Sequence, residues 1–173
     1  VNKLSALLIS LGIKKGDRVL IASENRPEWA IADLAIMTIG AIVVPAYTSN
    51  TEEDNAYLLN HSKAKLAITS GGKVASRLCL AADTIKTIKN IILIEDKTKN
   101  YEVSGCSVLS WTEELKKVDE IENINKLLSK IDPEDTCCFI YTSGTGGRPK
   151  GVMLTHKSII SNIKACDHVI KDI

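Results

Sequence analysis

Short apolar runs alternate with stretches of helical apolar spacing along most of this chain. The apolar runs predict strands at 18–23, 41–46, 65–69, 90–95, 136–141 and 151–155, with one more short strand inside 96–110. Helices are predicted at 1–11, 27–39, 51–61, 73–88 and 157–173, and the charged stretch 112–131 predicts one or two solvated helices. Strands that alternate with helices predict an α/β fold, in which a mostly parallel sheet is flanked by helices.

Turn and capping residues mark several of these boundaries. Pro27 suits the first turn of a helix, and Gly40 suits the position just after its end. Thr51-Glu52-Glu53-Asp54 resembles a capping box with Asp in the last place. The continuous apolar strands NIILIE (90–95) and TCCFIY (136–141) are typical of strands that are buried on both faces of a parallel sheet.

One stretch imitates a membrane span, because residues 29–47 are almost entirely apolar. Asp33 lies inside it, and an acid near the middle of a bilayer costs roughly 2.5–3.5 kcal/mol. Gly40 and Pro45 also divide the stretch. We therefore predict a buried helix followed by a buried strand.

Composition narrows the function. The chain has 173 residues, of which 45% are hydrophobic and 25% charged, and its net charge is +1. A nucleic-acid partner is not expected, since that would need clustered basic residues, and the low aromatic content of 4% gives little surface for stacking bases. The five cysteines are odd in number and contain no C-x-x-C pair, which favours buried free thiols in a reducing cytoplasm over a zinc site or disulfides.

The segment YTSGTGGRPKGVMLTH, residues 141–156, carries the strongest chemical signal. Glycine lets a backbone turn tightly and point its N–H groups at an anion, while hydroxyl groups and a lysine add further donors. The segment supplies Thr142, Ser143, Gly144, Thr145, Gly146, Gly147 and Lys150. These are the groups that a polyphosphate needs.

Neither of two well-known phosphate motifs fits this segment. A Walker A loop needs Gly before its lysine and Ser or Thr after it, whereas Lys150 lies between Pro149 and Gly151. A dinucleotide fingerprint would need Gly at 149 and a helix afterwards. From composition alone, a glycine-rich hairpin turn and a phosphate site remain about equally supported.

The same segment resembles the phosphate-binding signature of the adenylate-forming, AMP-binding superfamily, usually YTSGTTGxPKGV. It departs at Gly146, where that family commonly has Thr, so one hydroxyl is lost. Residues 16–47 and the stretch AYLLNHSKAKLAIT (56–69) also resemble this family, particularly its long-chain fatty-acid–CoA ligases. The resemblance covers most of the chain and weakens between about 96 and 130.

This resemblance implies an enzyme that joins a fatty acid to ATP, releases pyrophosphate, and transfers the acyl group to coenzyme A. It implies that Thr142, Ser143, Gly144, Thr145, Gly146, Gly147 and Lys150 bind the ATP phosphates, and Thr142 is the candidate ligand for Mg²⁺. Residues 1–173 would be part of the adenylating domain, truncated at both ends. The remainder of that domain, with the adenine-binding motifs, and a small C-terminal domain with a catalytic lysine would lie elsewhere.

Several expectations follow for the protein as a whole. The chain contains no convincing general acid or base, and the isolated piece is expected to be inactive. His156 is expected to face the ligand cleft, to begin a helix, or to pack beneath the loop. Residues 143–148 are expected to be mobile without nucleotide. A cytoplasmic location is expected, with peripheral membrane contact left open.

Two alternatives stay open. The chain could be a non-catalytic nucleotide-binding or scaffolding fragment, or part of an adenylating enzyme for another carboxylate.

Overall fold

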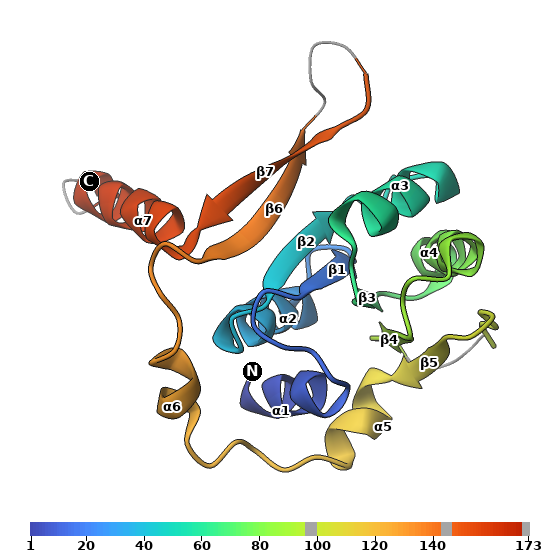
Figure 1. Ribbon diagram of the computed structural model, residues 1–173, viewed down its shortest axis with the longest axis horizontal. Coiled ribbons are helices and arrows are strands. Elements are labelled where there is room, and N and C mark those ends of the chain that lie inside the picture. Colours follow the sequence, from blue (N-terminus) through green and yellow to red (C-terminus); the bar gives the residue numbers. More distant parts are fainter. Residues whose placement is uncertain (96–99, 143–146, 171–173) are drawn as a thin grey trace.

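A mixed sheet organises the chain (Figure 1). The computed structural model describes residues 1–95, 100–142 and 147–170. In this part of the chain the strands lie in the order β5-β4-β3-β1-β2-β6-β7, and all neighbours are parallel except β6 and β7. The strands are β1 (Arg18–Ala22), β2 (Ile42–Ala46), β3 (Leu66–Thr69), β4 (Asn90–Leu93), β5 (Ser107–Ser110), β6 (Thr136–Thr142) and β7 (Lys150–Thr155).

Helices cover both faces of this sheet, as Figure 1 shows. They are α1 (Asn2–Ser10), α2 (Pro27–Thr38), α3 (Glu52–Ser62), α4 (Gly72–Ile85), α5 (Trp111–Lys116), α6 (Ile124–Leu128) and α7 (His156–Ile170). Alternate residues of β1 enter different cores: Val19 and Ile21 pack with α1 and α2, whereas Leu20 and Ala22 pack with α3 and α4. A strand whose successive side chains point to opposite faces must be apolar throughout when both faces are covered. The predicted α/β class and mostly parallel sheet are confirmed.

The strand order reverses at β1, which lies between β2 and β3. In open α/β sheets, ligands bind outside the carboxyl ends of the strands near such a reversal. The carboxyl ends of β1, β2 and β6 meet at the same edge because these three strands are parallel. The glycine-rich segment follows β6 and therefore begins at this edge.

The predicted helix boundaries are mostly confirmed. Thr51 caps α3 through its Oγ1, which accepts a hydrogen bond from the Asp54 N–H at 3.2 Å, while the Asp54 carboxylate accepts one from the Thr51 N–H at 2.9 Å. The Thr51 N–H and the Thr51 hydroxyl both donate to the Asp54 carboxylate, and these two hydrogen bonds lower the pKa of Asp54. Helix α4 ends three residues earlier than predicted, because Lys86 takes a left-handed conformation with φ of 56°.

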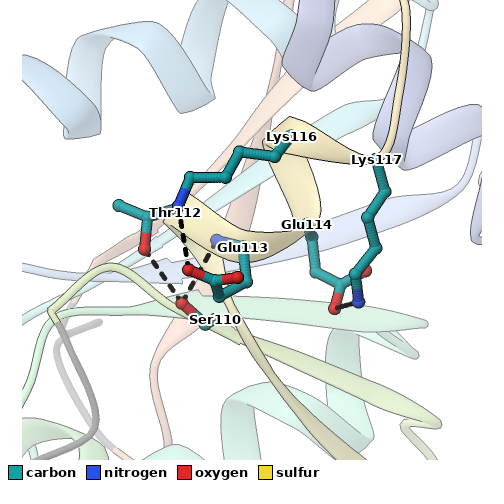
Figure 2. Close-up of polar contacts among 6 residues, drawn as sticks. All are labelled: Ser110, Thr112, Glu113, Glu114, Lys116 and Lys117. Atoms are coloured by element: carbon teal, nitrogen blue, oxygen red, sulfur yellow. Dashed lines mark hydrogen bonds and ion pairs between the residues drawn. The ribbon is translucent and has the colours of Figure 1, made fainter.

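The charged stretch after β5 forms two short helices, α5 and α6. Figure 2 shows how α5 is held: the Ser110 hydroxyl accepts a hydrogen bond from the Glu113 N–H, and lysines pair with glutamates one turn earlier. The two pairs are Lys116 with Glu113 at 3.0 Å and Lys117 with Glu114 at 2.7 Å. Exposed pairs of this kind contribute only a few tenths of a kcal/mol each, roughly 0.2–0.5. These contacts of α5 are local, and they lie away from the sheet edge where β6 ends (Figure 1).

The stretch that imitates a membrane span forms α2 and β2. Within the described residues, no helix combines the length and apolar character that crossing a bilayer requires. Three residues of α2 are buried, Ala32, Ala35 and Ile36, while Leu34 is 52% exposed. The helix is therefore buried along one side, and β2 is almost fully buried as predicted.

The prediction that β6 is buried on both faces is wrong in its middle. Cys137 and Cys138 are buried, but Phe139 and Ile140 are only half-buried. Two features explain this exposure. The register between β2 and β6 joins a single pair, Val43 and Cys138, and β7 on the other side of β6 lies at the edge of the sheet. The five cysteines, all within the described ranges, are unpaired.

Candidate functional site

The β6–β7 hairpin brings together the residues on either side of the glycine-rich segment. Thr142, the last residue of β6, lies directly opposite Lys150, the first residue of β7. Directly opposite residues in an antiparallel pair project on the same face, and the next pair projects on the other face. Thr142 and Lys150 therefore share one face of the hairpin, whereas Tyr141 and Gly151 share the opposite face.

Three of the seven predicted phosphate-binding residues lie within the described ranges: Thr142, Gly147 and Lys150. The other four, Ser143, Gly144, Thr145 and Gly146, lie outside the described residues. Gly147 has φ of 116°, a conformation that glycine adopts without strain and other residues rarely adopt. Thr142 and Lys150 are both exposed, and neither side chain makes a hydrogen bond or ion pair to another residue in the described part of the chain.

The expected mobility of residues 143–148 concerns mainly 143–146, which lie outside the described residues. Of the other two, Arg148 places its guanidinium 5.4 Å from the centre of the Tyr57 ring. A cation over the face of an aromatic ring is attracted by the ring's electrostatic field. The segment thus has an attachment to α3 at its end, which its lack of apolar side chains did not suggest.

Helix α3 contacts both strands of the hairpin on the Tyr141 face. His61 Nδ1 and the Tyr141 hydroxyl share a hydrogen bond of 2.8 Å, and the Tyr57 hydroxyl donates one of 2.7 Å to the Pro149 carbonyl. The rings of Tyr57 and His61 stack at 5.2 Å, and the Tyr141 ring meets both of them edge-on. Sequence reasoning missed these residues; the four-residue spacing of Tyr57 and His61, which places both on one side of a helix, was the available signal.

Tyr141 fits closely against its partner in β7. A Cβ atom at position 151 would lie 3.2 Å from Cζ of the Tyr141 ring, closer than such atoms usually approach. Glycine at 151 therefore leaves room for the ring. Burial of the hydroxyl raises the pKa of Tyr141, and Tyr57 adds to this effect, so Tyr141 stays neutral and can share its proton with His61.

Two cavities lie beside the hairpin at the carboxyl ends of the strands. One of about 420 Å³ is lined by Ser23 and Asn25 from the segment after β1 and by Trp29 of α2, together with Thr48 and Ile140. The other, of about 380 Å³, is lined by Asp54, Tyr57, Thr142 and Pro149. Both include Pro45, Tyr47 and Tyr141 in their walls. Cavities of this size are typical of small-molecule sites, so a ligand held at Thr142 has space next to it.

His156 lies away from the carboxyl ends of the strands where the two cavities are found. It begins α7 at the end of β7 that is distant from the glycine-rich segment, and it lines an apolar cavity with Leu34, Met37 and Pro133. Burial lowers its pKa, and its Nε2 has no hydrogen-bond partner among the described residues. The interpretation of His156 as a helix-start residue is confirmed, and the alternatives that it faces the cleft or packs beneath the loop are wrong.

The described residues contain no group of three or more His, Cys, Asp or Glu side chains that could hold a metal ion. For Mg²⁺, the hairpin offers the exposed hydroxyl of Thr142, a hard oxygen ligand. One hydroxyl is not a binding site by itself. It fits a magnesium ion that keeps several waters and is held mainly by phosphate oxygens, which is how Mg²⁺ usually binds with nucleotides.

The chain is similar in sequence and in fold to known proteins. Residues 1–172 match the profile of a protein family described as AMP-binding enzyme. Fatty acyl-CoA synthetase A of Dictyostelium discoideum is 35% identical over 166 residues, which are 94% of this chain and 24% of that protein. 4-Coumarate–CoA ligase 4 of Arabidopsis thaliana is 37% identical over 171 residues, covering 94% of this chain and 28% of that protein.

Among solved structures, the anthranilate CoA ligase AuaEII in complex with anthranoyl-AMP superposes with a TM-score of 0.75 at 22% identity, covering 90% of this chain and 28% of that one. A benzoate CoA ligase from Burkholderia xenovorans LB400 superposes with a TM-score of 0.74 at 20% identity. These likenesses establish the fold. The chain spans about a quarter of the length of the relatives that it matches.

Proposed function

Because the chain belongs to the AMP-binding enzyme family, we propose that it is part of an ATP-dependent acid–CoA ligase and that its β6–β7 hairpin binds the phosphates of ATP. Residues 1–173 would form part of the adenylating domain. The remaining motifs of that domain and a small C-terminal domain would be supplied by the rest of the protein. Such an enzyme joins a carboxylic acid to AMP and then transfers the acyl group to coenzyme A.

One observation carries this proposal: Thr142 and Lys150 lie opposite each other where β6 and β7 join the glycine-rich segment. Both side chains are exposed, and neither is engaged by another described residue. A structural turn would gain nothing from an unpaired lysine and hydroxyl on the same face. A polyphosphate would gain a mobile positive charge, a hydroxyl donor and the N–H groups of the glycine-rich backbone between them.

The charge of the substrates explains why these groups would matter. A carboxylate must approach the α-phosphate of an ATP that already carries several negative charges. Lys150 would bind the β- and γ-phosphates and stabilise the negative charge that builds up on pyrophosphate as it leaves. Thr142 would orient the same phosphates and offer one oxygen to Mg²⁺, and the bound ion would neutralise phosphate charge.

The acid is proposed to be a long-chain fatty acid. Fatty acyl-CoA synthetase A of Dictyostelium discoideum and the long-chain-fatty-acid–CoA ligase FadD15 of Mycobacterium tuberculosis are each 35% identical to this chain. The 4-coumarate–CoA ligase is 37% identical, so an aromatic acid is the second candidate. None of the contacts described above selects between them, because the two cavities beside the hairpin have mixed polar and apolar walls.

The test uses the whole protein that carries this chain. Purified protein is given MgATP, coenzyme A and a panel of fatty acids of graded length together with 4-coumarate, and the products are identified. The proposal expects AMP, pyrophosphate and an acyl-CoA. Release of ADP and phosphate, or no acyl-CoA with any acid, would contradict it.

Two lysine variants test whether the hairpin takes part in the formation of the acyl-adenylate. Lys150→Ala should lower the rate of acyl-adenylate formation by about 10²–10³-fold, the usual cost of removing a donor that stabilises a charged transition state. Lys164→Ala is the matched control, since Lys164 is an exposed lysine on α7. Equal rates for the two variants would remove the phosphate-binding role from Lys150.

A further inference from the structure

The end of the hairpin that bears Thr142 and Lys150 lies beyond the residue pairing that joins β6 to β2. The register between β2 and β6 joins Val43 to Cys138, four residues before Thr142. In Figure 1 the two strands continue past the other strands and rise toward α3. A two-stranded ribbon that no third strand pairs with is at best marginally stable in water, so this end needs side-chain contacts if it is to keep its position.

Helix α3 provides contacts to both strands at that end. Tyr57 donates its hydroxyl proton to the Pro149 carbonyl at 2.7 Å, immediately before Lys150. His61 bonds the Tyr141 hydroxyl at 2.8 Å, immediately before Thr142. Each hydrogen bond therefore ends one residue away from a proposed phosphate-binding side chain.

The residue that contacts α3 and the residues proposed to bind phosphate lie on opposite faces of the hairpin. Tyr141 lies on the face of the hairpin toward α3, where it belongs to the core that includes Leu58 and Leu59. Thr142 and Lys150 project on the opposite face, because the side chains of successive residues alternate. The contacts with α3 consequently leave the two phosphate-binding side chains free.

We propose that Tyr57 and His61 are positioning residues: they hold the ends of β6 and β7 so that Thr142 and Lys150 are set for the phosphates of ATP before the nucleotide binds. This inference rests on the proposed function of the hairpin. Neither residue touches the substrate in this scheme. Both act through the backbone of Pro149 and the side chain of Tyr141.

A positioning role predicts a specific kinetic pattern. If the hairpin spends less time in its binding position, the apparent affinity for MgATP falls by the same factor. Bound MgATP restores the position, so the rate at saturating nucleotide is retained. One lost hydrogen bond of ordinary strength corresponds to a change of about 2- to 10-fold.

The first experiment uses Tyr57→Phe in the whole protein, which removes one hydroxyl and keeps the stacked ring. We expect KM for MgATP to rise about 2- to 10-fold, with kcat for adenylation within 2-fold of wild type and KM for the acid unchanged. Calorimetric titration with MgATP should show the same loss of affinity without any turnover. Unchanged affinity for MgATP would overturn the proposal.

Tyr101→Phe is the matched control. The Tyr101 hydroxyl also donates to a backbone carbonyl, that of Gly72, at 3.2 Å, far from the hairpin at the start of α4. Its loss should leave the affinity for MgATP unchanged. If both phenylalanine variants weaken MgATP binding equally, the effect reflects general stability and the positioning role is refuted.

His61 supplies the second variant and a rescue. His61→Ala should weaken MgATP binding, and His61→Asn should restore part of it, because the Asn amide reaches about as far as Nδ1. Hydrogen exchange of residues 147–155 gives a readout independent of nucleotide, and it should be about 2- to 10-fold faster in Tyr57→Phe. Exchange that rises without any change in MgATP affinity would show an attachment that does not serve binding, which also overturns the proposal.

The outcomes separate this inference from the proposed function. A wild-type protein that binds MgATP but forms no acyl-CoA refutes the ligase activity and leaves the positioning role to be decided by affinity. A wild-type protein that binds no MgATP refutes both.

Discussion

Asp33 makes the stability of this chain depend on pH in a predictable direction. It lies in the middle of α2, half-buried, and its carboxylate makes no hydrogen bond or ion pair to any other described residue. Burial raises the pKa of the Cys138 thiol to about 12, and the nearby negative charge of Asp33 contributes to this rise. Burial raises the pKa of Asp33 itself from 3.8 to about 6.

The sign of the effect follows from proton binding. Between pH 3.8 and about 6 the folded state holds more protons at Asp33 than the unfolded state does, so the free energy of unfolding falls as pH rises through this window. Below it the carboxyl is neutral in both states and costs nothing. Above it the charged form is present in both states and the whole penalty applies.

A shift of about two pH units corresponds to about 3 kcal/mol at 1.36 kcal/mol per unit. Asp33 is only half-buried, and solvent screens part of its charge, so we expect roughly 1–1.5 kcal/mol. Asp33→Asn should therefore raise the free energy of unfolding by about that amount at pH 8 and by close to zero at pH 3.5. In a chain of this size it should raise Tm by about 3–5 °C at pH 8.

The assay is urea unfolding of wild type and Asp33→Asn at both pH values, with Asp119→Asn as the control. Asp119 is an exposed aspartate without a partner in the described part of the chain, so its variant should match wild type at each pH. An Asp33→Asn effect of equal size at pH 3.5 and pH 8 would refute the reasoning, since a packing effect would be independent of pH.

Three further predictions test the capping box and the proposed chemistry. Thr51→Ala should lower the free energy of unfolding by about 1 kcal/mol because it removes the cap of α3, whereas exposed Thr84→Ala should cost less; equal losses in thermal melts would contradict this. Lys150→Ala in the whole protein should slow acyl-adenylate formation more than thioester transfer, because pyrophosphate has left before the second step; single-turnover rates measure both, and equal slowing would remove the assignment. The 173-residue chain alone should show no pyrophosphate exchange with any fatty acid, because it spans only about a quarter of the length of its relatives; exchange above background would contradict this.

Local patterns predicted most of the fold. Strands β1 to β4 were predictable from short apolar runs. Helices cover both of their faces, so the residues on both faces are apolar. The end of α4 was predicted less well. The helix ends because Lys86 takes a left-handed conformation. A lysine in the sequence does not predict this, since glycine is the usual residue there.

The contacts that hold the hairpin could not be predicted in the same way. Tyr57 and Pro149 are 92 residues apart, and His61 and Tyr141 are 80 apart. They meet because β6 is placed beside β2, whose following helix is α3. No local periodicity encodes that placement, since it results from how the crossovers order the strands.

The glycine-rich motif contains two kinds of residue, and the structure separates those within the described ranges. The side chains of Thr142 and Lys150 are exposed and make no hydrogen bond or ion pair to a described residue, as expected of groups that bind a ligand. Their neighbours Tyr141, Pro149 and Gly151 are engaged: the first two bond α3, and the third leaves room for the Tyr141 ring. Alternation along two short strands thus places adjacent residues of one motif on different faces. A substitution at 151 would disturb the proposed phosphate site through Tyr141 and His61, without removing Thr142 or Lys150.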